Sequence, residues 1–265
     1  MDYMATDIVD IERMPRGGPR ASCLDRRLET GRLEYLDRDS DRDAGLEARK
    51  RSVVRALEWT GDVFGNHDRI AELALREIAD VPDPKVLELG AGHGGLSRRI
   101  LDAHPTAEVT VTDIDQTSVA AMAASDLGTH PRAQVRTMDA TAIDAPDRAF
   151  DLAVFALSFH HLTPPLAARA IAEGTRAADA LLVVDLPRPP APLHLLRLAT
   201  MLPLAPFLPF AHDGVISSLR CYSPSALRAL AAYADPAITV DLRGGLLSEQ
   251  VMVARRPRCT RQGRC

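Results

Sequence analysis

The chain has 265 residues, a formal net charge of -4 and an isoelectric point near 6.1. This length accommodates one α/β domain with a core large enough for a seven-stranded sheet, and the acidic balance provides no basic field for nucleic acid or an anionic membrane. The cysteines form no C-x-x-C pair and have no neighbouring histidine cluster, so the pattern predicts no metal site and a reduced, intracellular setting. The acidic N-terminus lacks an apolar signal region, and we therefore expect a cytoplasmic location.

Both ends of the chain are rich in charge. Residues 1–46 contain Pro15, Gly17, Gly18 and Pro19 and a run of Asp and Arg, a composition typical of a flexible segment. Residues 256–265 are predicted to form a basic tail. The sequence between them, residues 47–255, is predicted to form one catalytic domain.

Helical spacing of apolar residues opens this domain. Residues 46–59 and 67–79 each place apolar side chains on one helix face, which predicts a helical cap over residues 47–80. Both helices precede the first predicted strand.

A glycine-rich turn follows that strand. Residues 86–95 read Val-Leu-Glu-Leu-Gly-Ala-Gly-His-Gly-Gly and lead into a helix. Gly90, Gly92 and Gly94 are expected to adopt positive φ angles and to let a ligand approach the backbone, while the helix start offers free N–H groups. Because Gly90, Gly92 and Gly95 also satisfy G-x-G-x-x-G, the glycines alone do not separate a nicotinamide dinucleotide from other adenosine cofactors.

The acid before the turn distinguishes these possibilities better. With Glu88 the segment reads Glu-x-Gly-x-Gly-x-Gly, which resembles motif I of the class I S-adenosylmethionine-dependent methyltransferases. The resemblance implies that Glu88 lies near the methionine amino group, a cation that a pyrophosphate site would not contain. It also implies that the turn contacts this cofactor through Gly90, Ala91, Gly92 and Gly94.

Two further strand ends fit the resemblance. Residues 108–113 form the second predicted strand, whose terminal Asp113 is expected to accept hydrogen bonds from both ribose hydroxyls, with Ile114 against the adenine. Asp115 is predicted to cap a helix over residues 116–127. Residues 133–139 form the third strand, and Asp139 and Ala140 take the family's adenine-edge position.

The fourth strand ends in a histidine pair. Residues 150–162 closely resemble the corresponding strand of small-molecule methyltransferases, including its His-His-Leu ending. The resemblance implies that Phe155 and Ala156 lay backbone against the methionine half of the cofactor. Of the two histidines we expect one to face inward, and His161 is favoured as a general base, although a structural role for the pair is an open alternative.

An unusual segment follows the fifth predicted strand, residues 180–185. Residues 187–218 carry seven prolines in an otherwise apolar stretch, which Arg197 and the prolines prevent from spanning a membrane. We predict a lid over an aromatic or lipophilic acceptor, with no stable membrane insertion. His212, oriented by Asp213, is the rival catalytic base, and the acceptor's polar edges are assigned to Arg220 and Tyr222.

The order of elements predicts the fold. After a helix starting at Ser223, residues 237–242 and 246–254 form a last strand pair, and the last strand of the family is antiparallel. Alternating strands and helices predict a Rossmann-like, doubly wound α/β sheet of seven strands with the Pro-rich insertion after strand 5. The helical cap of this family commonly shapes the acceptor pocket, where Trp59, Phe64 and His67 are candidates.

The resemblance implies methyl transfer from S-adenosylmethionine to an oxygen or nitrogen of a small molecule. We expect a role in biosynthesis and no nucleic acid partner. Three alternatives remain open: other sulfonium chemistry on the same cofactor, a non-catalytic binding module, and a nicotinamide-dependent oxidoreductase. The last has no Tyr-x-x-x-Lys set for hydride transfer.

Overall fold

The computed structural model describes residues 10–35, 45, 48–49, 52–53, 65–203, 205, 207–244 and 248–257. Its centre is a seven-stranded sheet of order β3-β2-β1-β4-β5-β7-β6. The strands are β1 (Lys85–Leu89), β2 (Glu108–Asp113), β3 (Ala133–Thr137), β4 (Phe150–Ala156), β5 (Ala178–Asp185), β6 (Thr239–Arg243) and β7 (Gln250–Arg255). β7 pairs antiparallel with both β5 and β6, whereas β1 to β5 are parallel. The predicted fold class is confirmed.

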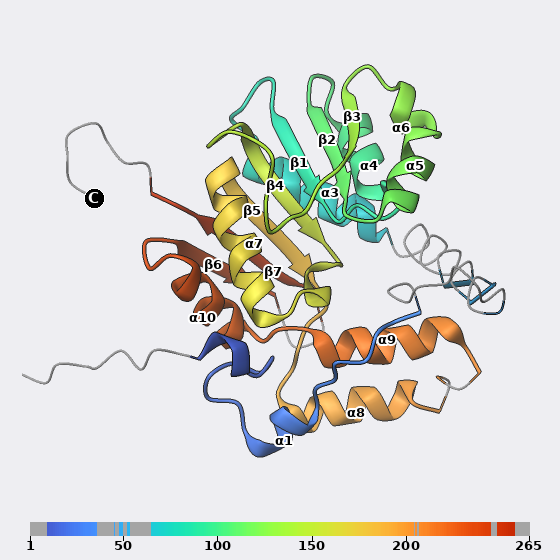
Figure 1. Ribbon diagram of the computed structural model, residues 1–265, viewed down its shortest axis with the longest axis vertical. Helices are drawn as coiled ribbons and strands as arrows, with labels where there is room; N and C mark the ends of the chain where they lie inside the picture. Colours follow the sequence, from blue (N-terminus) through green and yellow to red (C-terminus); the bar gives the residue numbers. More distant parts are fainter. Residues whose placement is uncertain are drawn as a thin grey trace, which may run out of the picture.

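Helices cover both faces of the sheet (Figure 1). Alternate residues of each central strand point to opposite faces, so Leu87 and Leu89 pack with one set of helices and Val86 with the other. One layer contains α3 (Asn66–Glu77), α4 (Gly95–Ala103), α5 (Gln116–Ala123) and α6 (Asp126–Thr129). The opposite layer contains η1 (Ile11–Arg13), α7 (Pro164–Ala177) and α10 (Pro224–Ala234). The central strands are therefore buried on both sides, as their continuous apolar sequences require.

Short polar side chains begin several of these helices. Asp115 caps α5 by accepting from the backbone N–H groups of Thr117 and Ser118, as predicted. The single helix predicted over residues 116–127 is wrong, because α5 ends at Ala123 and Ser125 caps a separate helix, α6. Ser125 accepts from the backbone N–H of Leu127, which starts the new turn. The cap position thus overrides the apolar spacing.

The predicted cap is described in part. α3 confirms the helix predicted over residues 67–79, and it packs on α4, β4 and β5 with Ile70, Ala71 and Ala74 buried. Of the helix predicted over residues 46–59, residues 48–49 and 52–53 are described, and all four are helical, with Val53 buried. Trp59 and Phe64 lie outside the described residues. So does the predicted tail beyond residue 257.

The Pro-rich insertion forms two helices, α8 (Ala191–Met201) and α9 (Pro209–Arg220), which lie side by side below the sheet in Figure 1. Prolines occupy the first turn of both helices, where the missing N–H has no intrahelical partner to lose. Several large apolar side chains of this hairpin are exposed, with Phe207 at 81% and Leu196 at 64%. Within the described residues, no helix is both long and apolar enough to cross a membrane.

The N-terminal charged segment, predicted to be flexible, is packed over residues 10–35. α1 (Cys23–Arg27) lies beside α8 (Figure 1), and Leu28 joins a small apolar cluster with Ala191, Leu198 and Val215. Two buried arginines, Arg16 and Arg188, hold this segment in place by donating to backbone carbonyls. Composition did not reveal these contacts, because each of the hydrogen bonds between the segment and the rest of the chain joins residues more than 140 positions apart in the sequence.

Candidate active site

The glycine turn after β1 has the predicted backbone. Gly90, Gly92 and Gly94 have φ angles of 64°, 59° and 77°, in the left-handed region that favours glycine. A Cβ atom on Gly90 would lie 2.8 Å from Ser158 Oγ, and one on Gly94 would overlap Leu127 Cδ1. A Cβ atom on Gly92 would meet nothing within 4 Å. Gly90 and Gly94 are thus required by internal packing, while the space beside Gly92 is open.

Glu88 lies under this turn, buried at 3% exposure. Ser97 Oγ in the first turn of α4 donates to Glu88 Oε2. Burial raises the pKa of Glu88 to about 7, against the hydrogen bonds from Ser97, and the Asp113 carboxylate raises it further. A buried carboxyl group of this kind is suited to a cationic partner.

Asp113 ends β2 beside the turn. Its Oδ2 accepts from the backbone N–H of Gly92 at 2.8 Å, and its Oδ1 accepts from that of Asp115 at 2.9 Å. Neighbouring Ile114 is 67% exposed, an uncommon position for a large apolar side chain at a strand end. The two residues therefore present a carboxylate and an apolar surface at the open side of Gly92.

The ends of β3 and β4 complete this edge of the sheet. Asp139 is exposed, and its Oδ1 accepts from both the backbone N–H and the hydroxyl of Thr141 at 2.8 Å, while Ala140 packs on the core. Phe155 is buried against Phe159 with ring centroids 5.5 Å apart, and Ala156 is half-buried. The structure thus brings the predicted cofactor residues to one edge, and their contacts with a cofactor remain predictions.

The histidine pair lies on η2 (Phe159–His161), a 3₁₀ turn after β4. β4 ends at Ala156, so strand geometry does not separate the two rings, which lie side by side with centroids 4.4 Å apart. The more deeply buried ring is that of His160, with 4% of its side chain exposed against 28% for the favoured His161. His160 is buried: its Nδ1 lies 2.8 Å from Asp185 Oδ1, and its backbone N–H donates to Asp185 Oδ2. Burial lowers the pKa of His160, but Asp185 and Glu34 outweigh it and raise that pKa to about 9.

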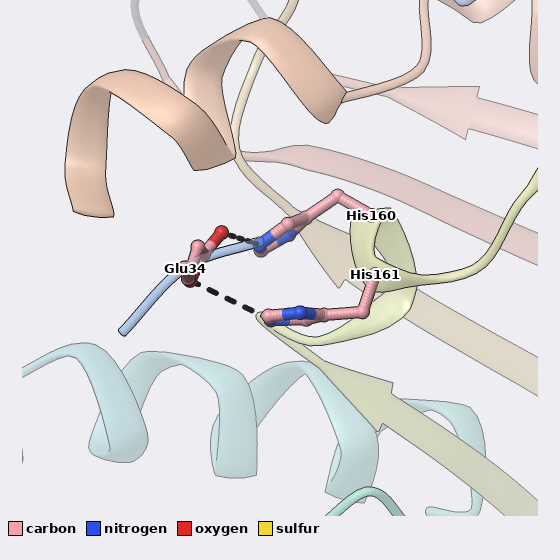
Figure 2. A group of neighbouring side chains, drawn as sticks. All are labelled: Glu34, His160 and His161. Carbon is pink, nitrogen blue, oxygen red and sulfur yellow. Dashed lines mark ion pairs between the residues drawn. The ribbon is translucent and has the colours of Figure 1, made fainter. Parts of the chain in front are cut away.

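Glu34 is the site residue that sequence analysis missed. It is 3% exposed, and Figure 2 shows its carboxylate facing both rings. Oε1 lies 3.5 Å from His160 Nε2, Oε2 lies 3.9 Å from His161 Nε2, and Ser217 Oγ of α9 donates to Oε1 at 2.7 Å. Although burial raises the pKa of Glu34, the histidines and Ser217 lower it overall. Glu34 stands in a charged segment with no motif around it, so the sequence does not indicate that it belongs to the site.

His212 and Asp213 on α9 form the predicted pair. His212 Nδ1 lies 2.9 Å from Asp213 Oδ1, and the buried Asp213 also accepts from the backbone N–H of Tyr35. The Tyr35 ring stacks on His212 with centroids 4.4 Å apart. Residues 34 and 35 consequently connect this pair to the histidines of η2.

Arg220 and Tyr222 have a different role from the one predicted. Arg220 Nη2 donates to the carbonyl of His161 at 2.8 Å, and Tyr222 Oη donates to that of Leu162 at 2.7 Å. Both residues are buried. Assigning them to the polar edges of an acceptor is wrong, because they brace the η2 turn from inside the protein.

His67 lies at the start of α3, close to the glycine turn. A Cβ atom on Gly95 would lie 2.5 Å from its Cε1, and its ring centroid is 5.5 Å from that of His93. His67 thus lies beside the glycine turn, and its predicted place in the acceptor pocket remains a prediction.

Comparisons with known proteins agree with this arrangement. Residues 86–179 match the model of a methyltransferase domain. The chain is 34% identical over 109 residues to the malonyl-[acyl-carrier protein] O-methyltransferase of Geobacter sulfurreducens, covering 41% of this chain and 39% of the relative. It is 33% identical over 101 residues to ribosomal RNA small subunit methyltransferase A of Thermotoga petrophila, covering 38% of each. The chain thus spans about two fifths of the length of these curated relatives.

A solved structure extends the likeness to most of the chain. The plantazolicin methyltransferase BpumL in complex with SAH aligns with a TM-score of 0.62 and 11% identity, covering 82% of this chain and 92% of that one. At this identity the likeness concerns the fold. Residues 86–179 therefore resemble a methyltransferase domain, and the seven-stranded sheet that contains them has the same fold as this solved methyltransferase.

Proposed function

We propose that this protein binds S-adenosylmethionine and transfers its methyl group to an oxygen or nitrogen of a small aromatic or lipophilic molecule. The observation that carries the proposal is the open space beside Gly92, next to the Asp113 carboxylate that accepts from the Gly92 N–H. It lies at the carboxyl ends of parallel strands, where ligands of doubly wound sheets bind.

The residues at this edge fit the cofactor. We assign the ribose hydroxyls to Asp113, the adenine to Ile114 and Asp139, and the methionine amino group to Glu88. The exposed Ile114 and the carboxylate of Asp113 provide the apolar and polar halves of a nucleoside site. When bound, S-adenosylmethionine supplies a methyl group on a positively charged sulfur, a good leaving group.

The protein's own contribution is chiefly placement. When binding holds a nucleophile in line with a reactive methyl group, most of the entropic part of the activation free energy of methyl transfer is already overcome. The α8–α9 hairpin offers apolar side chains, including Leu196 and Phe207, that would exclude water and favour a lipophilic acceptor. The acceptor class in this proposal follows from that surface.

Proton transfer is assigned to His212. Asp213 accepts from the Nδ1 side of the ring, which leaves Nε2 available to an acceptor hydroxyl or amine. His161, favoured from sequence, is the second candidate, and its Nε2 faces Glu34 in Figure 2.

Cofactor binding is tested by titration calorimetry. Asp113→Ala is expected to weaken S-adenosylmethionine binding by about 1.5–3 kcal/mol through loss of charge-assisted bonds. Gly92→Val should abolish binding by filling the open space. Because valine also strains a positive φ, Gly65→Val is the matched control: Gly65 has a φ of 60° and no close neighbour, and that variant should retain binding. Binding of a nicotinamide dinucleotide in place of S-adenosylmethionine, or unchanged affinity in Asp113→Ala, would contradict the assignment.

Acceptor chemistry is tested by incubating the protein with S-adenosylmethionine and a panel of hydrophobic phenols and amines, then weighing the products. His212→Ala is expected to lower kcat roughly 10²-fold and to change its pH profile, because the base is lost. His130→Ala, on the loop before β3, serves as the control.

Several outcomes would redirect the proposal. If His212→Ala keeps the wild-type rate and pH profile, the assigned base is wrong and placement alone carries catalysis. A preference for small polar acceptors would contradict the apolar surface argument. Cofactor consumption without an added methyl group would indicate other sulfonium chemistry, and binding without any product would indicate a binding module.

A further inference from the structure

Glu34, His160 and His161 converge on one point from two distant parts of the chain (Figure 2). We propose that these three side chains bind a divalent transition-metal ion, with Zn²⁺ the best match, beside the acceptor side of the proposed active site. The donors are two imidazole nitrogens and one carboxylate oxygen, all within 4.8 Å of one another.

The buried ring of His160 is the observation that points to a ligand. Its side chain is 4% exposed, and within the described residues its Nε2 makes no hydrogen bond, although Glu34 Oε1 lies 3.5 Å away as an ion-pair partner. A buried polar atom without a hydrogen bond is costly, so native structures rarely keep one without a reason. An ion slightly off the line between Nε2 and Glu34 Oε1 would bind both atoms.

The other side of the same ring has the support that metal-bound histidines usually have. Asp185 Oδ1 lies 2.8 Å from Nδ1, so an Nδ1–H can be donated to this carboxylate while Nε2 binds the ion. The ion takes the place of the proton that Glu34 and Asp185 favour on the metal-free ring, and that proton is released to solvent on binding. The backbone N–H of His160 donates to the second oxygen of Asp185. Ser217 similarly orients Glu34 by donating to Oε1 at 2.7 Å.

The spacing of the donor atoms suits a small ion. Tetrahedral Zn²⁺ with bonds of about 2.0–2.1 Å holds its ligand atoms roughly 3.4 Å apart. The separations are 3.5 Å for Glu34 Oε1 to His160 Nε2 and 3.9 Å for Glu34 Oε2 to His161 Nε2, and one donor atom from each residue lies within 4.8 Å of the others. His161, with 28% of its side chain exposed, is the ligand with the most freedom to move toward the ion.

The donor set also indicates the kind of site. Two histidines and one glutamate are the protein ligands of several catalytic zinc centres, where the fourth position is open to water or substrate. If the open fourth position binds the acceptor's oxygen, that role rests on the proposed function. Metal binding by the three side chains does not depend on it. In this proposal His161 is a ligand, and His212 alone remains the base.

A second group of donors overlaps this one. His160, Asp185 and Cys221 also lie within reach of one another, but they use Nδ1, which Asp185 already occupies, and Cys221 Sγ donates to the Ser217 carbonyl. The proposal therefore places the ion on the Nε2 side. Cys221→Ser discriminates between the two positions, because it removes a ligand only from the Nδ1 side.

The test is direct metal binding to tag-free full-length protein treated with a chelator. Titration calorimetry with Zn²⁺ should give one site per chain, and Co²⁺ should give the visible absorption of tetrahedral coordination. Glu34→Gln and His161→Ala should each weaken Zn²⁺ binding at least tenfold. His194→Gln, which alters a buried histidine paired with Ser218, and Cys221→Ser should bind as wild type.

Absence of stoichiometric Zn²⁺ binding to folded wild-type protein would overturn the proposal and identify the cluster as an ion-pair network. Equal affinity in Glu34→Gln and His161→Ala would also overturn it. S-adenosylmethionine is titrated into the same preparations: Zn²⁺ binding without cofactor binding supports the metal site and contradicts the proposed function, whereas the reverse result overturns the metal site alone.

Discussion

Glu88 places an ionisable group between the sheet and the start of α4, where water does not reach it. Its pKa in the folded protein is about 7, above the ordinary value of 4.5. Folding therefore favours the protonated form, and the unfolded chain releases that proton at lower pH. The contribution of Glu88 to stability is fully present below pH 4.5 and is lost as the pH rises to about 7.

The Glu88→Gln variant should remove this dependence. Glutamine stays neutral, so we expect the variant to be more stable than wild type at pH 8 by up to about 3 kcal/mol, and close to wild type at pH 4.5. Urea denaturation at both pH values measures the difference. Glu108→Gln, at the exposed start of β2, is the control and should follow the wild type. An equal pH dependence in wild type and Glu88→Gln would show that this carboxyl group does not titrate as inferred.

Residues near the glycine turn were predictable because local chemistry determines them. Gly90, Gly92 and Asp113 follow directly from strands and turns that the local sequence encodes. The same sequence says nothing of Glu34, whose burial depends on His160 and Ser217. Their contacts join residues more than 120 positions apart, and no periodic pattern records such a pairing.

At the scale of elements, Arg188 ties the N-terminal segment to the helices that follow β5. Its guanidinium donates to the carbonyls of Asp25 and Leu28 on one side and of Leu219 and Cys221 on the other. Such hydrogen bonds from a charged group are stronger than neutral ones. The N-terminal segment and the end of α9 thus share one anchor.

The variant Arg188→Met should loosen this connection. Methionine is similar in length to arginine but has no N–H groups, so four carbonyl groups lose their donor. We expect the free energy of unfolding to fall by about 2–4 kcal/mol. Limited proteolysis, read by mass spectrometry at Arg26 and Arg27, should become faster. The exposed Arg20→Met is the control. Unchanged cleavage and unchanged thermal stability would show that Arg188 does not anchor the segment.

Element types were predictable where apolar spacing and cap residues agree. The strands β1, β2 and β4 and the helix α10, capped by Ser223, follow from patterns within a few residues. The division between α5 and α6 escaped prediction because Ser125 starts a new turn inside a continuous apolar pattern. Proline positions did indicate the breaks around α8 and α9, although not that the two helices pair.

At the scale of the whole molecule, stability is unevenly distributed. The sheet is buried between two large apolar clusters, one of which includes Ile11 and Met14, whereas residues 16–35 are attached to the rest of the chain largely through polar contacts and one small apolar cluster. Hydrogen exchange should therefore show residues 16–35 and 191–220 opening together, at a lower free energy than β1, β4 and β5. Peptide-resolved mass spectrometry measures this. Equal protection across both regions would contradict the inferred hierarchy.

The position of Glu34 has a consequence for protein synthesis. Residues 10–35 leave the ribosome before η2, β5 and α9, which supply their partners, have been made. During translation the segment has nothing to dock on, while the strands around the glycine turn already have neighbours to pair with. The cofactor half of the domain can thus take shape cotranslationally, and the side that holds Glu34, His160 and His212 closes last, after the chain has emerged beyond residue 221.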